Sequence, residues 1–211
     1  ITRPCTKHNW LVRSVHDLPR ILHEAFYVAT SGRPGPVVVD IPKDVQIASG
    51  IYQGPDNVVH KTYRPRLKGD LGAIRSLVEM MANARRPILY TGGGVINSGP
   101  EASRLLRRLV DVTGFPVTST LMGLGAVPAS HPSWLGMLGL HGTYEANLAM
   151  HDCDLMVCIG ARFDDRITGR LDAFSPGSKK VHIDIDPSSI NKNVKVDIGI
   201  VGDCGNVLAD I

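Results

Sequence analysis

The sequence predicts an α/β protein whose larger part is a doubly wound parallel sheet, preceded by the tail of another α/β domain. Short, wholly apolar runs such as Ile88–Tyr90 and Leu155–Ile159 alternate with longer amphipathic patterns of helical period. Strands covered by helices on both faces of a parallel sheet are apolar throughout, whereas strands with one wet face alternate in polarity. Repeated strand–loop–helix units with apolar strands therefore favour the doubly wound architecture.

Residues 1–45 are expected to be the end of a preceding domain. Asp17–Thr30 has a helical pattern, with Asp17 as a candidate N-cap and Pro19 in the first turn. The predicted apolar face of this helix consists of Leu18, Ile21, Leu22, Ala25, Phe26 and Ala29. The β-branched run Val37–Val39 follows. A helix and then a short apolar strand form the closing unit of a parallel sheet, whose earlier strands are expected to be missing.

Residues 46–68 are predicted to be an interdomain linker. Periodicity disappears there, and Gly, Pro, Asn and Tyr accumulate. A patternless stretch of about 20 residues is too long for an ordinary loop. The second domain is therefore expected to span residues 69–211.

Four helices are predicted in this second domain. The first is capped by Asp70 and has an apolar face formed by Leu71, Ile74, Val78, Met81 and Ala82. The second begins near Pro100, with Ala102, Leu105, Leu106, Leu109 and Val110 inward and Glu101, Arg104, Arg107 and Arg108 outward. The third is Gly142–Met150, and the last begins near Cys204.

Five strands are predicted between these helices. They are Ile88–Tyr90, Phe115–Thr118, Leu155–Ile159, Val181–Ile185 and Ile198–Val201. Ser119–Leu140 is expected to be a long loop rich in Gly, Pro and Met.

Three consecutive glycines, Gly92, Gly93 and Gly94, follow the first of these strands directly. Because glycine has no Cβ, a ligand can approach the backbone there, and a helix beginning just beyond offers N–H groups to a phosphate. The pattern lacks the third glycine of G-x-G-x-x-G, since Asn97 stands in its place. On its own it is consistent with either a nucleotide-type ligand or a plain tight turn.

Ligands of doubly wound sheets bind outside the carboxyl ends of the strands. These ends are predicted at Thr91–Gly94, Ser119–Gly123, Gly160–Arg166, Asp184–Asp186 and Gly202–Cys204, and all are rich in glycine, hydroxyls or charge. A dinucleotide is long enough to span several of them. Less specific explanations remain open: Asp184 and Asp186 as helix caps, Arg162 to Arg166 as a solvated ion-pair network, and His141 as an ordinary loop histidine.

Composition excludes several other classes of protein. The chain of 211 residues has a net charge of +3 without a block of Lys and Arg, which argues against nucleic acid as the main partner. No apolar stretch approaches the roughly 20 residues that span a bilayer. The four cysteines form no C-x-x-C pair, the histidines form no H-E-x-x-H, and no metal site is expected. No G-x-S-x-G elbow supplies a nucleophile. The start, which is neither a Met nor a signal peptide, is expected to be a cut into a longer protein.

Seven motifs distributed over the chain together carry a family resemblance. They are GRPGPVVVDIPKD, YTGGGV, STLMGLG, LGMLGLHGTYEAN, GARFDDRITG, HIDIDP and IVGD. With them the chain resembles the catalytic subunit of the acetolactate synthase (acetohydroxyacid synthase) family, which uses thiamine diphosphate in branched-chain amino-acid biosynthesis. The resemblance implies that residues 1–45 end a pyrimidine-binding domain and that residues 69–211 form a Rossmann-like central domain that binds FAD.

The resemblance also implies the residues that contact FAD. Arg33 would reach the flavin from the preceding domain, and Gly92, Gly93 and Gly94 would lie against the ribityl-diphosphate region. The isoalloxazine side would be lined by Thr120, Leu121, Met122, Leu140, His141 and Gly142. Ribityl and phosphate oxygens would be held by Gly160, Arg162, Asp164, Arg166 and Ile167, and the adenosine by Asp184, Ile185, Gly202, Asp203 and Cys204. Asp165 and Arg166 would border the substrate entrance.

By the same resemblance, the full enzyme joins a two-carbon unit from pyruvate to a second pyruvate or to 2-oxobutyrate, with loss of CO2. Thiamine diphosphate and Mg2+ would be bound outside this segment, because neither the activating glutamate nor a G-D-G motif is found in it, and the segment alone is expected to be inactive. A homodimer or tetramer with a small regulatory subunit is implied. The location would be cytoplasmic in a bacterium, or plastid or mitochondrial in a eukaryote. Glyoxylate carboligase, pyruvate oxidase and a non-enzymatic nucleotide-binding module are the alternatives.

Overall fold

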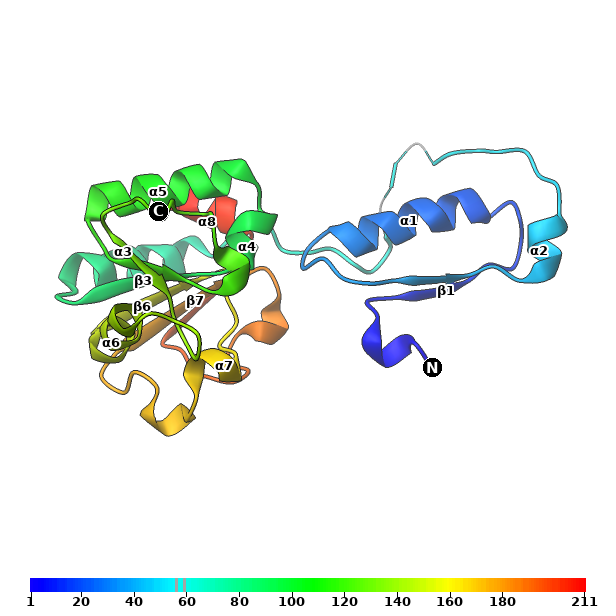
Figure 1. Ribbon diagram of the computed structural model, residues 1–211. Coiled ribbons are helices and arrows are strands. Elements are labelled where there is room, and N and C mark those ends of the chain that lie inside the picture. The colour runs from blue at the N-terminus through cyan, green and yellow to red at the C-terminus, as the bar shows by residue number, and fades with distance from the viewer. Residues whose placement is uncertain (56, 59) are drawn as a thin grey trace. The chain divides into compact units, whose positions relative to one another are not determined.

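The computed structural model describes residues 1–55, 57–58 and 60–211, which form two compact units, Ile1–Pro65 and Arg66–Ile211. Each unit has its own parallel sheet and its own apolar core. Helices and strands alternate along the chain in both units (Figure 1), as the sequence predicts for the α/β class.

The first unit is built around one strand–helix–strand motif. Its elements are the 3-10 helix η1 (Arg3–Cys5), β1 (Asn9–Leu11), α1 (Leu18–Thr30), β2 (Val38–Asp40) and α2 (Lys43–Ile47). Strands β1 and β2 pair in parallel, with Asn9 opposite Val38. The sequence analysis did not predict β1, because a run of three residues is too short to show a period. One earlier strand of the parallel sheet is thus present where all were expected to be missing.

Helix α1 buries only part of the predicted apolar face. It buries Ile21, Ala25 and Val28, whereas Phe26 is 72% exposed. Asp17 is also not the predicted cap, because its side chain accepts no backbone hydrogen bond and instead pairs with Arg20 at 3.0 Å. The apolar residues of α1 cover more of the helix circumference than the small core of the first unit can bury.

The predicted linker, residues 46–68, is divided between the two units, and its residues 56 and 59 lie outside the described part. Its first two residues end helix α2. Further along, Tyr63 Oη donates a hydrogen bond of 2.9 Å to the Ser31 carbonyl, and the Tyr52 hydroxyl lies 3.2 Å from His23 Nε2. Both contacts are made within the first unit.

The second unit contains a six-stranded parallel sheet in the order β5-β4-β3-β6-β7-β8. The strands are β3 (Pro87–Thr91), β4 (Val117–Ser119), β5 (Trp134–Met137), β6 (Leu155–Ile159), β7 (Lys179–Asp184) and β8 (Ile198–Val201). The chain runs outward from β3 to β5 and then returns to place β6 beside β3. The predicted doubly wound sheet is confirmed, and its topological switch point lies between β3 and β6.

Strand β5 was not predicted, since the sequence analysis placed these residues inside a long loop. All four of its residues are only partly buried, and Gly136 has a positive φ of 90°. It is an edge strand, paired with β4 through an irregular register. Its residues therefore lack the fully apolar pattern of a central strand.

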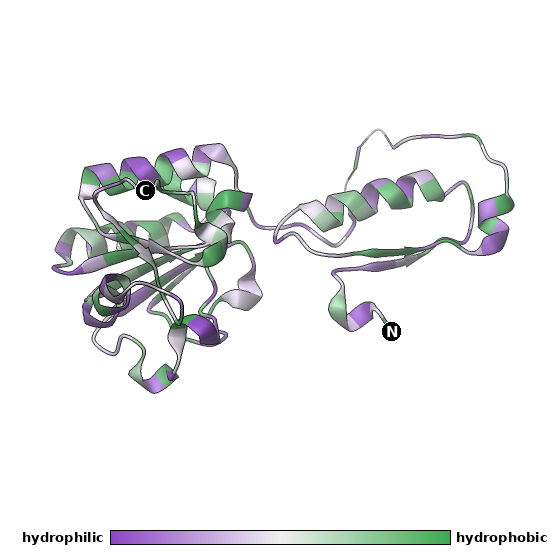
Figure 2. Ribbon diagram, in the orientation of Figure 1, coloured by the Kyte–Doolittle hydropathy of each residue, from purple (hydrophilic) through white to green (hydrophobic). Residues whose placement is uncertain are grey.

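Helices cover both faces of this sheet. They are α3 (Leu71–Asn83), α4 (Gly93–Asn97), α5 (Pro100–Thr113), α6 (Tyr144–Asp152), α7 (Asp165–Thr168) and α8 (Cys204–Asp210), with 3-10 turns η2 (Leu121–Gly123), η3 (Leu171–Ala173) and η4 (Pro187–Ser189). Helices α3, α5 and α8 lie on one face and α6 on the other (Figure 1). Helix α5 carries hydrophilic and hydrophobic residues along its whole length (Figure 2), as its amphipathic pattern predicts.

The two faces have separate cores because successive strand residues point to opposite sides. In β3, Leu89 packs into the core under α3, α5 and α8, while Ile88 and Tyr90 pack into the core that contains α6. The predicted cap of α3 is confirmed, since the Asp70 carboxylate accepts a hydrogen bond of 2.8 Å from Ala73 N. No helix within the described ranges is both long and apolar enough to cross a membrane.

Candidate functional site

The carboxyl ends of β3 and β6 approach each other closely at the switch point. The Gly92 N–H donates to the Ile159 carbonyl at 3.0 Å, and the Gly94 N–H donates to the Gly160 carbonyl at 2.8 Å. These two bonds extend the pairing of β3 with β6 past the strand ends. The predicted glycines thus lie directly beside the first residue of the predicted loop after β6.

Packing between chain segments requires the glycines at this point. A Cβ on Gly94 would lie 2.6 Å from the Gly160 Cα, and one on Gly92 would lie 2.5 Å from the Gly160 oxygen. Gly123, after β4, would place a Cβ 2.9 Å from the Gly92 Cα. Room for a ligand was the predicted reason for these glycines, and the structure supplies a second reason that is sufficient by itself.

A helix follows the glycines at once, as the sequence predicts. It is the five-residue α4, and the longer helix α5 begins at the predicted Pro100. Because the Gly94 N–H is bonded to Gly160, it is not available to a phosphate. The prediction of helix N–H groups free for a diphosphate is therefore wrong for Gly94.

Exposed apolar side chains follow the end of β4. Leu121 and Met122 lie on the turn η2 and are 67% and 73% exposed, and a Cβ on Gly93 would be 3.0 Å from Met122 Cβ. Thr120 precedes them and is held by a hydrogen bond of 2.9 Å from its N–H to the Thr91 carbonyl. These three residues, predicted to face an isoalloxazine ring, thus border the glycines at the end of β3.

The segment before α6 lies beside the loop after β6. The Leu140 N–H donates to the Arg166 carbonyl at 2.9 Å, and the Leu140 side chain is 67% exposed. His141 is exposed, and the Gly142 N–H closes a turn onto the Gly139 carbonyl. The fold therefore brings the predicted site residues near 140 next to those near 166.

Arg162 and Asp164 project from the loop after β6 and form an ion pair of 3.2 Å. A hydrogen bond with the Asp165 side chain and another from the Arg166 N–H lower the pKa of Asp164. Both ion-pair partners are solvent-exposed in part, at 58% and 36%. The structure thus contains an ion pair of the solvated kind that the sequence analysis left open. Because such an exposed pair is weak, Arg162 and Asp164 can each give it up to bind a ligand. Asp165 and Arg166 are exposed, and Ile167 packs against the core around α6.

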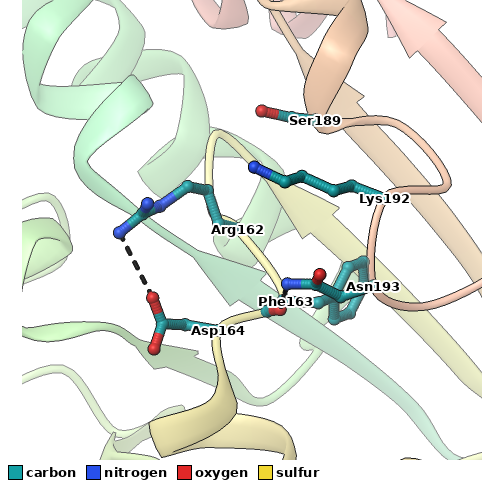
Figure 3. A pocket seen from close by; sticks show the side chains of 6 residues that line it. All are labelled: Arg162, Phe163, Asp164, Ser189, Lys192 and Asn193. Atoms are coloured by element: carbon teal, nitrogen blue, oxygen red, sulfur yellow. Dashed lines mark hydrogen bonds and ion pairs between the residues drawn. The ribbon is translucent and has the colours of Figure 1, made fainter. Parts of the chain in front are cut away.

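A pocket opens between this loop and the segment that follows β7. Its lining consists of Arg162, Phe163, Asp164, Ser189, Lys192 and Asn193. The ammonium end of Lys192 points toward Arg162 (Figure 3), so two cations and one carboxylate face the opening. The sequence analysis did not predict Ser189, Lys192 or Asn193 as site residues, because they lie beyond the end of the strand. The nearest signal in the sequence came from the turn residues Asp186–Pro187.

Asp184 and Gly202 lie next to each other at the ends of β7 and β8. The Gly202 N–H donates to the Asp184 carbonyl at 3.0 Å, and the Asp184 carboxylate, 7% exposed, accepts from the Asp186 N–H at 2.8 Å. Asp186 in turn caps η4 through the Ser188 N–H at 2.9 Å. The capping alternative holds for Asp186, and Ile185 between the two acids is partly buried.

Asp203 and Cys204 begin helix α8. The Asp203 carboxylate caps this helix by accepting from Gly205 N at 3.0 Å, and it also accepts from the Ser98 hydroxyl at 2.7 Å. Burial raises the pKa of the Cys204 thiol, so the thiol stays protonated. A Cβ on Gly160 would lie only 2.7 Å from the Cys204 sulfur. Both residues therefore have structural roles beside the predicted binding role.

Arg33 is the one predicted site residue in the first unit, and it is exposed there. All other predicted residues lie at the carboxyl edge of the sheet in the second unit. Within the described ranges no group of three or more His, Cys, Asp or Glu side chains is placed to hold a metal ion. The predicted site in the second unit presents charges of both signs, hydroxyls and exposed apolar side chains, which suits binding of an extended, partly charged ligand.

Comparison with known proteins identifies relatives over the whole chain. Residues 74–211 match the family described as thiamine pyrophosphate enzyme, central domain. The chain is 49% identical over all of its length to an acetolactate synthase of Mycobacterium leprae, of which it covers 33%. It is 46% identical, over 99% of its length, to the acetolactate synthase isozyme 3 large subunit of Escherichia coli, of which it covers 36%.

A third relative, the acetolactate synthase large subunit of Corynebacterium glutamicum, is 47% identical over 99% of the chain, which covers 33% of that protein. The chain thus spans about a third of the length of these relatives. The matched family segment contains the whole six-stranded sheet and every predicted site residue except Arg33. This chain belongs to the thiamine pyrophosphate enzyme family and contains its central domain.

Proposed function

We propose that this chain is part of the catalytic subunit of an acetolactate synthase and that its second unit binds FAD. The observation that carries the proposal is an identity of 45–49% to relatives of that name over essentially the whole chain. The names of these relatives favour acetolactate synthase over glyoxylate carboligase, pyruvate oxidase and a non-enzymatic module. Under the proposal, residues 1–45 end a pyrimidine-binding domain, and residues 69–211 form the FAD-binding domain.

The side chains at the carboxyl edge of the sheet fit the two chemical halves of FAD. Leu121, Met122 and Leu140 expose apolar side chains that suit the faces of an isoalloxazine ring. Arg162 and Lys192 offer cations to the diphosphate or ribose side. Buried Asp184 ends the strand beside them, where an acid suits a ribose hydroxyl.

The whole protein would condense a two-carbon unit from pyruvate with pyruvate or 2-oxobutyrate, releasing CO2. Thiamine diphosphate with Mg2+ supplies the electron sink for decarboxylation when bound. The role of the residues in this chain is to hold FAD, and Asp165 and Arg166, both exposed, would border the substrate entrance. We propose a homo-oligomer with a small regulatory subunit, since relatives are called large subunits, and a cytoplasmic or organellar location.

Titration of FAD against flavin fluorescence tests the cofactor assignment. Gly93→Asp introduces a carboxylate whose Cβ would lie 3.0 Å from Met122 Cβ, and we expect it to abolish binding. Gly177→Asp is the matched control, because a Cβ there meets nothing within 4 Å. Arg33→Ala tests the predicted contribution from the first unit.

Two results separate the parts of the proposal. Equal FAD binding by the wild type, Gly93→Asp and Gly177→Asp would refute a specific site at the glycines. Acetolactate formation from pyruvate by this chain alone, in the presence of thiamine diphosphate, Mg2+ and FAD, would contradict the proposal that the reacting groups lie in other segments.

A further inference from the structure

Three consecutive backbone carbonyls in the loop after β6 accept hydrogen bonds from side chains. The Ala161 carbonyl accepts from His182 Nε2 at 2.8 Å and from Cys158 Sγ at 3.1 Å. The Arg162 carbonyl accepts from Tyr90 Oη at 2.9 Å. The donors come from β7, β6 and β3, so three strands hold two adjacent peptide groups.

The third carbonyl, that of Phe163, accepts from Asn193 Nδ2 at 2.6 Å, across the pocket wall shown in Figure 3. The Phe163 ring is itself packed edge-on against His182, with ring centroids 5.1 Å apart, and against Phe174 at 5.9 Å. The loop is therefore held through its backbone and through the one aromatic side chain that it buries.

Burial alternates along this loop. Ala161 and Phe163 are each 3% exposed, whereas the side chains of Arg162 and Asp164 are 58% and 36% exposed. When the inward residues and the carbonyls are held, the outward side chains start from fixed Cα positions. The arrangement resembles a strand that continues past the end of β6, with its charged residues on the solvent side.

The donors from the three strands are enclosed by the protein. Tyr90, Cys158 and His182 are all completely buried. A carbonyl accepts only, so His182 must carry its proton on Nε2, while its Nδ1 has no partner in the described chain. Burial raises the pKa of both Tyr90 and Cys158, so each keeps the proton that it donates.

We propose that His182, Tyr90 and Asn193 are positioning residues that hold the loop after β6 so that its outward side chains meet the cofactor without rearrangement. The inference rests on the proposed function, since it takes FAD as the ligand of Arg162 and Asp164. Holding the loop before binding reduces the conformational entropy that binding would otherwise cost. None of the three was predicted as a site residue, because two lie in apolar strands and one in a polar loop.

Amide hydrogen exchange tests the holding of the loop without any ligand. In Tyr90→Phe the ring remains and only the hydroxyl is lost, and Asn193→Ala changes an exposed residue, so both variants are expected to fold. We expect exchange in residues 160–168 to quicken about fivefold in each variant. The matched control is Asn83→Ala, which removes an amide donor 2.7 Å from the Glu79 carbonyl in helix α3.

A second pair of variants tests His182. Glutamine can place an N–H near the position of the histidine Nε2, whereas leucine cannot. We expect His182→Leu to quicken exchange in the loop and His182→Gln to restore most of the protection. If the melting temperature of His182→Leu falls so far that the variant is unfolded, Tyr90→Phe and Asn193→Ala decide. Exchange in residues 160–168 that matches the Asn83→Ala control in both Tyr90→Phe and Asn193→Ala would overturn the proposal.

FAD titration of the same proteins separates this inference from the proposed function. We expect Tyr90→Phe and Asn193→Ala to bind FAD about fivefold more weakly than the wild type and Asn83→Ala. If the wild type does not bind FAD, the proposed cofactor is wrong, and the exchange result still decides whether the loop is held. If the wild type binds and the variants bind equally well despite faster exchange, the positioning role is refuted.

Discussion

Replacing Gly160 by alanine tests whether the switch point is closed by direct packing of the chain. Gly160 has a φ of +63°, where an alanine costs about 1 kcal/mol. Its new Cβ would lie 2.7 Å from both Cys204 Sγ and the Gly94 Cα, and overpacking of this kind costs about 1–3 kcal/mol. Since one neighbour is backbone and the other is buried, neither can easily move. We expect the free energy of unfolding to fall by about 2–4 kcal/mol.

Gly114→Ala supplies a matched control for the backbone term. Gly114 has a similar φ of +68°, and a Cβ there meets nothing within 4 Å, so we expect it to cost only about 1 kcal/mol. Urea unfolding of the second unit can be followed by Trp134 fluorescence in a Trp10→Phe background, because the two tryptophans lie in different units. If Gly160→Ala were no more destabilising than Gly114→Ala, the close-packing argument would be refuted.

Three further predictions concern capping, pH and the core. Asp203→Ala should destabilise the second unit by about 1–2 kcal/mol, and by more than Asp70→Ala, since Asp203 accepts from a hydroxyl as well as from helix N–H groups. A loss in urea unfolding equal to or smaller than that of Asp70→Ala would count against this. Burial raises the pKa of Tyr90 well above its usual 10.0, so its contribution to stability is complete below pH 10 and is lost as pH rises further, because the unfolded chain alone releases the proton. Tyr90→Phe should flatten this alkaline fall in the unfolding free energy, and an unchanged slope would exclude Tyr90 as its source. Leu106→Ala, at a fully buried position of α5, should cost about 2–5 kcal/mol in the same urea assay, and a loss below 1 kcal/mol would show that the core refills the cavity.

The fold could be predicted wherever burial gave a uniform pattern. The strands Leu155–Ile159 and Ile198–Val201 have the predicted bounds, since their apolar runs end at a glycine or a charged turn. Strand β5 escaped prediction because an edge strand is covered on fewer sides and tolerates polar residues and glycine. In α1 the sequence showed which residues are apolar but not how many of them the first unit could cover, so Phe26 was wrongly placed inward.

The residues of the candidate site also fall into those that the sequence could predict and those that it could not. The order of strands and loops placed Arg162, Asp164 and Asp184 at the carboxyl edge of the sheet from the sequence alone, and the structure has them there. The side chains beneath them could not be found, because Tyr90 and His182 lie within strands and their polar atoms meet the loop only once β3, β6 and β7 are adjacent. Sequence spacing reports which face a residue takes, whereas a hydrogen bond between strands depends on their order in the sheet.

The glycines after β3 show that packing and binding need not be competing explanations. Gly92 and Gly94 let the ends of β3 and β6 approach until a single Cβ would overlap the opposite backbone. The loop that carries Arg162 and Asp164 leaves the sheet from Gly160, at that same contact, and Tyr90 reaches it from the strand that the glycines end. A larger residue at the contact would separate the strand ends and move the charged loop away from its donors. The glycines would therefore support the proposed ligand site indirectly, by fixing where the loop begins, and this role does not require the third glycine of the G-x-G-x-x-G pattern.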